Sequence, residues 1–139
     1  MIFKQLFDQT SSTYTYLISS GKNREALIID PVLENTDKYL DILNNLNLKL
    51  VKVLDTHIHA DHITGMGKLQ EKTSCETVMG EKTPIEIISI KLKDGEELNI
   101  DGIKLKALYT PGHTIESYSF TINNKIFTGD SLLIGGTGR

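Results

Sequence analysis

Three of the four histidines in this chain fall within one short segment, residues 56–62, which reads Thr-His-Ile-His-Ala-Asp-His. In an extended backbone alternate side chains share a side, so His57 and His59 face together, and Asp61 and His62 follow where the chain bends. Imidazole and carboxylate ligands suit zinc, iron or manganese, and a segment without thiolates does not resemble a purely structural zinc site. The segment is therefore a candidate metal-binding loop.

Two further segments carry side chains that bind metals. His113, the fourth histidine, lies in Pro-Gly-His-Thr, and Asp130 lies in Thr-Gly-Asp. Each of the three segments follows a strand-like run, so their side chains can converge where strands end. A lone histidine in a loop is more often a polar surface group than a ligand. The shared position after strands favours the metal interpretation for both residues.

The elements that must position these segments are mainly strands. β-Branched and aromatic runs bounded by turn residues predict strands, and apolar residues at helical spacing predict two helices. The predicted strands are 2–8, 13–19, 26–29, 48–54, 76–79, 85–93, 97–100, 103–109, 117–122 and 125–127, and the predicted helices are 36–47 and 63–72. This order is not a regular βαβ alternation, so we expect a layered α/β or α+β fold.

Several small residues mark expected turns and close contacts. Asp94-Gly95, Asp101-Gly102 and Asn123-Asn124 predict hairpin turns. Gly65 and Gly67 weaken the start of the second helix, which favours a close backbone approach or a tight loop there. No linker or low-complexity tract divides the chain, so we expect a single domain over 1–139.

Composition narrows the range of partners and compartments. Hydrophobic residues make up 39% of the chain and charged residues 24%, as in an ordinary globular protein, and the formal net charge is −3. No basic cluster indicates nucleic acid, and no apolar stretch is long enough to cross a membrane. A single cysteine, Cys75, fits a reducing compartment and is expected to be a buried small apolar residue. We expect a cytoplasmic protein.

Taken in order, the three segments resemble the metallo-β-lactamase superfamily, which implies a four-layered αββα sandwich with the metal at one edge of the sheets. Residues 54–65 and 127–134 look most like the persulfide dioxygenases of the ethylmalonic-encephalopathy type. Residues 2–8, 12–17 and 29–32 are also similar to that subgroup, whereas glyoxalase II relatives tend to carry Trp in place of Ala60. The similarity extends over essentially the whole chain.

The dioxygenase resemblance implies one mononuclear non-haem Fe(II) per chain, held by His57, His113 and Asp130. The implied reaction oxidises glutathione persulfide with O2 to sulfite and glutathione. His59, Asp61 and His62 would then orient the ligands, with His59 evenly balanced between that role and direct metal binding. In this scheme Asp61 and His62 are the further catalytic candidates. Arg139 resembles an arginine near the substrate pocket that could pair with a glutathione carboxylate.

A glyoxalase II-like hydrolase is the alternative. There His57, His59 and His113 would hold one zinc, Asp61 and His62 would hold a second, and Asp130 would bridge them. A metal-activated water would attack the thioester of an acylglutathione. The chain ends before the further histidine that completes the second site in the family, which favours one metal over two.

Three departures from the family pattern lead to further expectations. Family members continue past Arg139, so we expect a sandwich that is incomplete at its C-terminus, with an exposed sheet edge that favours a homo-oligomer. Ile115 replaces the proline or asparagine often found there, and Gly135 replaces a basic residue. A catalytically inactive metal-binding fragment is therefore a third interpretation.

Overall fold

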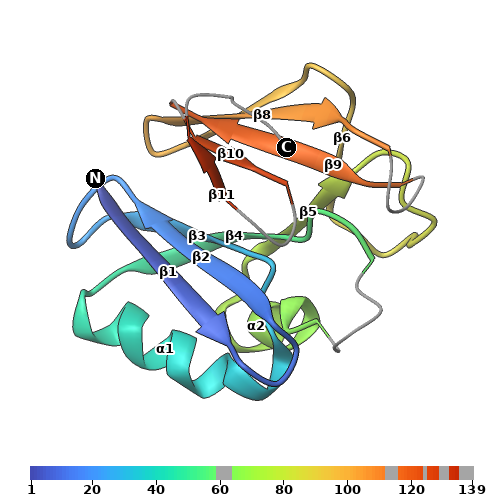
Figure 1. Cartoon of the computed structure of the whole chain (residues 1–139). Helices are drawn as coiled ribbons and strands as arrows, with labels where there is room; N and C mark the ends of the chain where they lie inside the picture. Colours follow the sequence, from blue (N-terminus) through green and yellow to red (C-terminus); the bar gives the residue numbers. More distant parts are fainter. Residues whose placement is uncertain (59–63, 112–115, 124, 129–131, 135–139) are drawn as a thin grey trace.

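The computed structural model consists of two β-sheets packed face to face, with both α-helices on the outer face of the first sheet (Figure 1). The structure describes residues 1–58, 64–111, 116–123, 125–128 and 132–134. The layered mixture of helices and strands expected from the sequence is confirmed. In the part of the chain that the structure describes, the layers are one of helices and two of strands, and no helix covers the outer face of the second sheet.

The first sheet combines antiparallel and parallel pairing. Its strands, in spatial order, are β1 (Ile2–Asp8), β2 (Thr13–Ser19), β3 (Glu25–Ile29), β4 (Lys49–Leu54), β5 (Glu76–Gly80) and β6 (Ile90–Leu92). The pairs β1–β2 and β2–β3 are antiparallel, and the pairs from β3 to β6 are parallel. The carboxyl ends of β3, β4 and β5 therefore meet at one edge of the sheet.

The second sheet is entirely antiparallel. Its order is β11 (Leu132–Ile134), β10 (Lys125–Phe127), β9 (Tyr118–Ile122), β8 (Ile103–Tyr109) and β7 (Glu97–Ile100). Its inner face packs on the first sheet in a buried cluster that includes Tyr16, Ile29, Leu105, Phe120 and Phe127. Burial of this apolar area is the main force that holds the two sheets together.

The helices α1 (Thr36–Asn45) and α2 (Met66–Thr73) cover the other face of the first sheet, and a short 3-10 turn, η1 (Leu33–Asn35), precedes α1. Helical spacing brings Tyr39 and Leu43 of α1 to one face, where they join a second buried cluster with Leu17, Ile28 and Val53 of the strands. Strand β3 is buried on both faces, as its continuous apolar run predicts.

Two expectations about local structure are wrong. The second helix begins at Met66 rather than at residue 63, because Thr64 instead forms an isolated bridge with Val32. Of the strand expected over 85–93, only Ile90–Leu92 forms. Ile85 and Ile88 lie in irregular backbone and pack against the helical side of the sheet, and Ile87 is 87% exposed, so these isoleucines do not follow strand periodicity.

Two of the three predicted hairpin turns form, and the third predicted turn connects the two sheets instead. Asp101 and Gly102 form the β7–β8 hairpin with positive φ angles of 51° and 90°, and Asn123 lies between the paired strands β9 and β10. Asp94-Gly95, in contrast, connects β6 of the first sheet to β7 of the second. A turn signal identifies a reversal of the chain, but not whether the next strand stays in the same sheet.

Cys75 is 3% exposed, as expected for a small apolar residue, and this burial raises the pKa of its thiol. None of the helices that the structure describes is long and apolar enough to cross a membrane.

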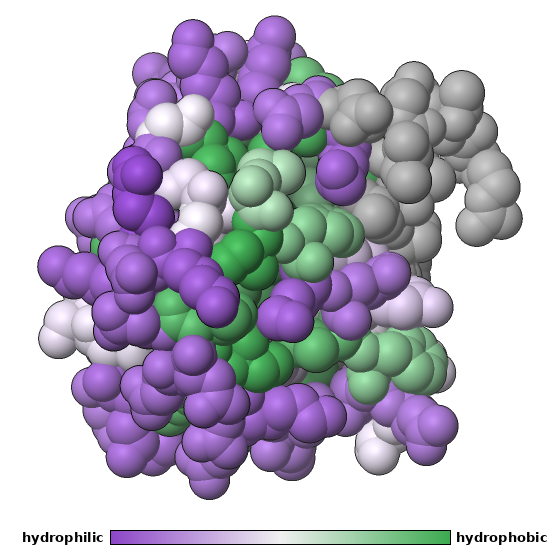
Figure 2. Space-filling view, turned by 90° about the vertical axis from the view of Figure 1, so that its left-hand side faces the viewer, coloured by the Kyte–Doolittle hydropathy of each residue, from purple (hydrophilic) through white to green (hydrophobic). Residues whose placement is uncertain are grey.

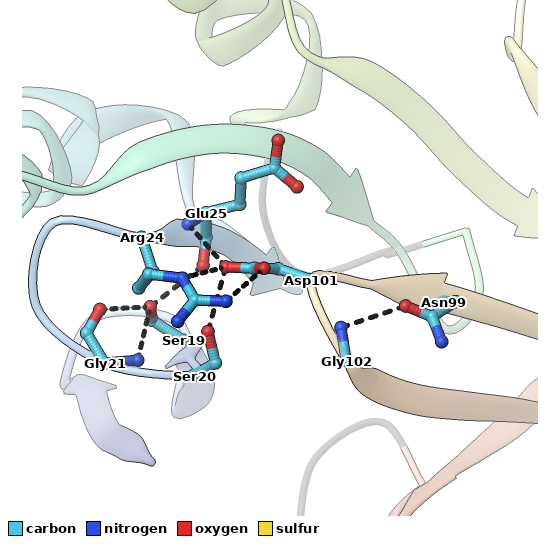
Figure 3. Close-up of polar contacts among 8 residues, drawn as sticks. All are labelled: Ser19, Ser20, Gly21, Arg24, Glu25, Asn99, Asp101 and Gly102. Atoms are coloured by element: carbon cyan, nitrogen blue, oxygen red, sulfur yellow. Dashed lines mark hydrogen bonds and ion pairs between the residues drawn. The ribbon is translucent and has the colours of Figure 1, made fainter.

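An ion pair joins the two sheets at the amino ends of β3 and β8 (Figure 3). Arg24 donates from Nε and Nη2 to the Asp101 carboxylate at 2.8 and 2.6 Å, and Ser20 Oγ donates to the same carboxylate at 3.0 Å. Hydrogen bonds from Arg24 and Ser20, with smaller contributions from the backbone N–H of Glu25 and the charge of Arg24, lower the pKa of Asp101 from its ordinary 3.8 to about 2. The surface on the left of Figure 1, which contains the N-terminus, is mostly hydrophilic with a strip of apolar residues between the polar ones (Figure 2).

The Arg24–Asp101 ion pair predicts a change in stability that occurs only at acidic pH. A carboxyl whose pKa falls on folding stabilises the protein above its unfolded pKa, and that contribution disappears as the pH falls through the folded pKa. For Asp101 the window lies between about pH 4 and pH 2. The difference in free energy of unfolding between wild type and Asp101→Asn, measured by urea denaturation, should be constant at higher pH and shrink across this window.

The matched control is Glu86→Gln. Glu86 is exposed and forms no ion pair within the described segments. Replacing Glu86 by Gln should leave the dependence of the free energy of unfolding on pH unchanged in the acidic range. An Asp101→Asn curve parallel to wild type down to about pH 2 would contradict the assigned role of Arg24.

Candidate metal centre

The strands that precede the three candidate metal segments end on one side of the sandwich. β4 runs toward this edge and delivers the chain to His57. β8 ends and β9 begins there, because the two strands are antiparallel and Tyr109 pairs with Tyr118. β10 is antiparallel to β9, with Phe127 opposite Phe120, so it also ends at this edge. The strands that precede each of the three candidate metal segments therefore end close together, as the sequence predicts.

The start of the metal-binding segment is anchored by a buried carboxylate at the end of β3. Thr56 donates its backbone N–H to Asp30 Oδ1 at 2.8 Å, and its hydroxyl lies 2.9 Å from Asp30 Oδ2. Asp30 is fully buried and Thr56 is 1% exposed. Neighbouring parallel strands bring the two residues together, although 26 positions separate them in sequence.

The backbone of Asp30 is itself constrained. Its φ angle is +55°, a left-handed conformation that aspartate tolerates better than most residues. Its N–H donates to the carbonyl of Leu54 at 2.7 Å, and its carbonyl accepts from Thr15 Oγ1 at 2.7 Å. Thr15 Oγ1 in turn lies 3.1 Å from the hydroxyl of Tyr39. Asp30 is thus held by a network that extends from β2 to helix α1.

His57 is the candidate ligand whose surroundings the structure describes. Its ring is partly buried, and Nδ1 lies 2.9 Å from Thr56 Oγ1. Because Nδ1 is engaged by this hydroxyl, a metal contact of the ring falls to Nε2. A neutral imidazole bound through one ring nitrogen and hydrogen-bonded through the other is the usual state of a metal-ligating histidine. The chemistry at His57 therefore fits a metal.

The second sheet fixes the same segment from the other side. Tyr118 donates its backbone N–H to the carbonyl of Thr56 at 3.0 Å, and Ile58 donates its N–H to Glu116 Oε1 at 3.1 Å. Glu116 is only 8% exposed. His57 thus lies between two residues whose backbones are bonded to the segment that enters β9, which limits its motion relative to the second sheet.

Two further bonds close the chain between β8 and β9. Thr110 donates its N–H to the carbonyl of Ser117 at 3.2 Å, and the hydroxyls of Thr110 and Ser119 are 2.8 Å apart. These contacts fix both ends of the segment that contains His113 in the sequence. The anchoring residues are polar and lie at strand ends, where backbone groups leave the regular ladder.

The remaining predicted site residues, His59, Asp61, His62, His113, Asp130 and Arg139, lie outside the described residues, as do Ile115 and Gly135. Within the described residues, no three His, Cys, Asp or Glu side chains form a group that could hold a metal. The described part of the site therefore consists of His57 and the side chains that anchor its backbone.

The sequence did not predict the anchoring roles of Thr56 and Glu116. Glu116 contacts a residue 58 positions away, and no local pattern signals such a pair. Asp30 did carry a signal, since it ends a buried strand just before Pro31, at the edge where open sheets commonly place functional groups.

Comparison with known proteins gives one family match. Residues 9–87 match the model of the metallo-beta-lactamase superfamily. A crystal structure of ETHE1 from Myxococcus xanthus is 45% identical in sequence, with a TM-score of 0.89 over all of this chain and 61% of that chain.

Curated relatives of two kinds are similar to this chain. Mouse persulfide dioxygenase ETHE1, mitochondrial, is 37% identical over all of this chain and 56% of its own length. A hydroxyacylglutathione hydrolase of Pseudoalteromonas translucida is 32% identical over 93% of this chain and 50% of its own length. The chain thus spans about half the length of the curated relatives it matches.

Proposed function

We propose, from the premise that the chain belongs to the metallo-beta-lactamase superfamily, that it forms the metal-bearing part of a persulfide dioxygenase. The proposed reaction oxidises glutathione persulfide with O2 to sulfite and glutathione. The observation that carries the proposal is the similarity to ETHE1 proteins, which covers the whole chain, whereas the hydroxyacylglutathione hydrolases match 85% to 93% of it. The arrangement of three strand ends at one edge supports it.

The proposed ligands are His57, His113 and Asp130. Fe(II) bound by two imidazoles and one carboxylate leaves open coordination positions for a sulfur ligand and for O2. His59, Asp61 and His62 are proposed to orient these ligands, with His59 the alternative direct ligand, and Arg139 to pair with a carboxylate of glutathione.

The anchoring residues have a defined task in this proposal. Thr56 and Glu116 bond the metal-binding segment to the first sheet and to the entry of β9, respectively. They keep the His57 backbone at a fixed distance from the segment that follows β8. Catalysis that depends on ligand geometry needs such fixed positioning.

A metal-dependent thioester hydrolase is the second candidate. The similarity to hydroxyacylglutathione hydrolases supports it. It would use zinc, one ion or two, with His57, His59 and His113 at the first ion. Under both candidates the substrate is a small glutathione-linked thiol derivative. The cytoplasmic location, the single domain and the homo-oligomer stay predictions.

Metal analysis with an oxygen electrode tests the proposal on protein purified without air. We expect one iron per chain and oxygen uptake when glutathione persulfide is added, with sulfite as product. Two zinc ions per chain with cleavage of an acylglutathione, and no oxygen uptake, would instead assign the hydrolase. Bound metal without either reaction would support an inactive metal-binding protein.

A further inference from the structure

We propose that the pocket between helix α2 and the segment connecting β5 to β6 binds a small, neutral, apolar molecule. The pocket has a volume of about 290 Å³. An engineered apolar cavity of about 150 Å³ already binds benzene, so this space admits a molecule of one or two rings. Its apolar wall consists of Met66, Met79, Ile85, Ile87 and Ile88, and we call it the α2–β5 pocket.

The floor of the α2–β5 pocket belongs to the core on the helical side of the first sheet. Met66 and Met79 are buried there, and Ile85 and Ile88 pack against the same cluster. Methionine side chains are flexible and polarisable, so they adapt to the shape of an apolar ligand. A pocket with an apolar wall and few polar groups is the usual form of a small-molecule site.

The polar groups of the wall favour a neutral ligand. Thr77 Oγ1 accepts the backbone N–H of Ser89 at 2.9 Å, and Gln70 Nε2 donates to Ser89 Oγ at 3.4 Å, so the neutral polar side chains bond within the protein. Among the described lining residues there is no lysine, arginine or histidine, whereas Asp55 contributes a carboxylate. An anion would therefore enter without a cationic partner, at a cost in desolvation.

Ile87 lies at the rim of the α2–β5 pocket. Its side chain is 87% exposed, more than any other large apolar side chain that the structure describes. An apolar molecule in the pocket would cover part of this side chain, and removal of apolar surface from water favours binding. The exposure of Ile87 thus contributes to a site instead of standing alone on the surface.

Gly67 gives a second, independent indication. It lies in helix α2 and lines the pocket, although glycine disfavours a helix relative to alanine. A Cβ added at Gly67 meets no atom within 4 Å, so no close approach of a neighbouring group requires glycine at this position. A larger side chain would instead occupy open space at the pocket. Glycine at position 67 therefore leaves the entrance open.

Indole is a suitable probe, because the chain contains no tryptophan and the emission of indole moves to shorter wavelength in apolar surroundings. We expect a saturable shift when the purified chain is added to indole, with excitation beyond the absorption of tyrosine. Amide resonances of α2 and of residues 85–88 should move in the same titration. Indole-3-acetate, an anion of similar shape, should bind at least about 10-fold more weakly.

Two substitutions test the position of the site. Gly67→Leu should abolish indole binding, while its free energy of unfolding in urea stays at or above that of wild type. Ile87→Ser removes an apolar contact at the rim and should weaken binding roughly 10-fold. The matched control is Phe7→Ser, because Phe7 is 47% exposed on β1, outside the pocket. This variant should bind indole as wild type does.

Several outcomes would overturn the proposal. They are the absence of saturable binding to folded wild type, undiminished binding to folded Gly67→Leu, and equal binding of indole and indole-3-acetate. If Gly67→Leu does not fold by circular dichroism, unchanged binding by Ile87→Ser is decisive instead. A wild-type dimer in sedimentation that Ile87→Ser dissociates, without indole binding, would assign the pocket to a second copy of the chain.

The α2–β5 pocket and the proposed metal centre can be tested separately. None of the described lining residues is a proposed metal ligand, and indole binding is measured without oxygen chemistry. Indole binding without oxygen uptake contradicts only the dioxygenase. Oxygen uptake without indole binding contradicts only the pocket.

Discussion

Replacing His57 by alanine should reduce metal affinity by more than about 100-fold. Loss of groups that merely orient a ligand costs roughly 10- to 100-fold, and loss of the ligand itself should cost more. The measurement is metal content after dialysis against a chelator, followed by a zinc titration. The loss should be accompanied by loss of the proposed oxygen uptake, because the proposed iron site would lack one of its three ligands.

Ile58→Ala is the matched control for this substitution. Ile58 is the next residue, its side chain is 39% exposed, and its contact with Glu116 is made by the backbone N–H, which alanine retains. This variant should keep the metal content of wild type. If His57→Ala retained its metal, the metal-binding interpretation of the segment 56–62 would be wrong for its first histidine.

Gly80→Ala should be the most destabilising single-methyl change in the described core. A Cβ added at Gly80 overlaps carbons of the Tyr118 ring, which is 1% exposed. The ring has little room to move, since it also packs against Tyr109 and Phe120, at centroid distances of 5.2 and 6.4 Å. We expect a loss of about 3 kcal/mol in the free energy of unfolding, at the upper end of the usual cost of overpacking.

Gly67→Ala should have the opposite effect on the free energy of unfolding from Gly80→Ala. A Cβ at Gly67 meets no atom within 4 Å, whereas one at Gly65 would lie 3.2 Å from the Val32 carbonyl, so the close approach that the sequence allows at the start of this helix occurs at Gly65. Gly67→Ala in helix α2 should raise the free energy of unfolding by up to about 1 kcal/mol. Similar losses for Gly80→Ala and Gly67→Ala in urea denaturation would contradict the packing at Tyr118.

A double-mutant cycle locates the cause of the Gly80 effect. In a Tyr118→Ala background the added methyl at position 80 has no ring to meet, so its cost should fall well below that in wild type. An unchanged cost would assign the effect to the backbone of β5 rather than to the ring.

The sequence by itself determined most of the strands, both helices and the order of the three metal-competent segments, but it did not predict β11. Alternating and continuous apolar runs are local signals, so β1 to β4 and α1 follow from them to within a few residues. The turn at Asp101-Gly102 is local too. The residues of the segment 56–62 are similarly identifiable, because metal chemistry restricts residue type and spacing within one loop.

Only the tertiary structure decided which side chains support that loop. Asp30 contacts Thr56, Glu116 contacts Ile58, and Arg24 contacts Asp101 across 26, 58 and 77 positions, respectively. Ile85 and Ile88 depart from strand periodicity for the same reason, because they pack against the helical side of the first sheet. Sheet pairing and the packing of one sheet on the other set these contacts, and neither leaves a periodic trace in the chain. The sequence thus identifies the candidate ligands, and the fold supplies the hydrogen bonds that hold the backbone on both sides of His57.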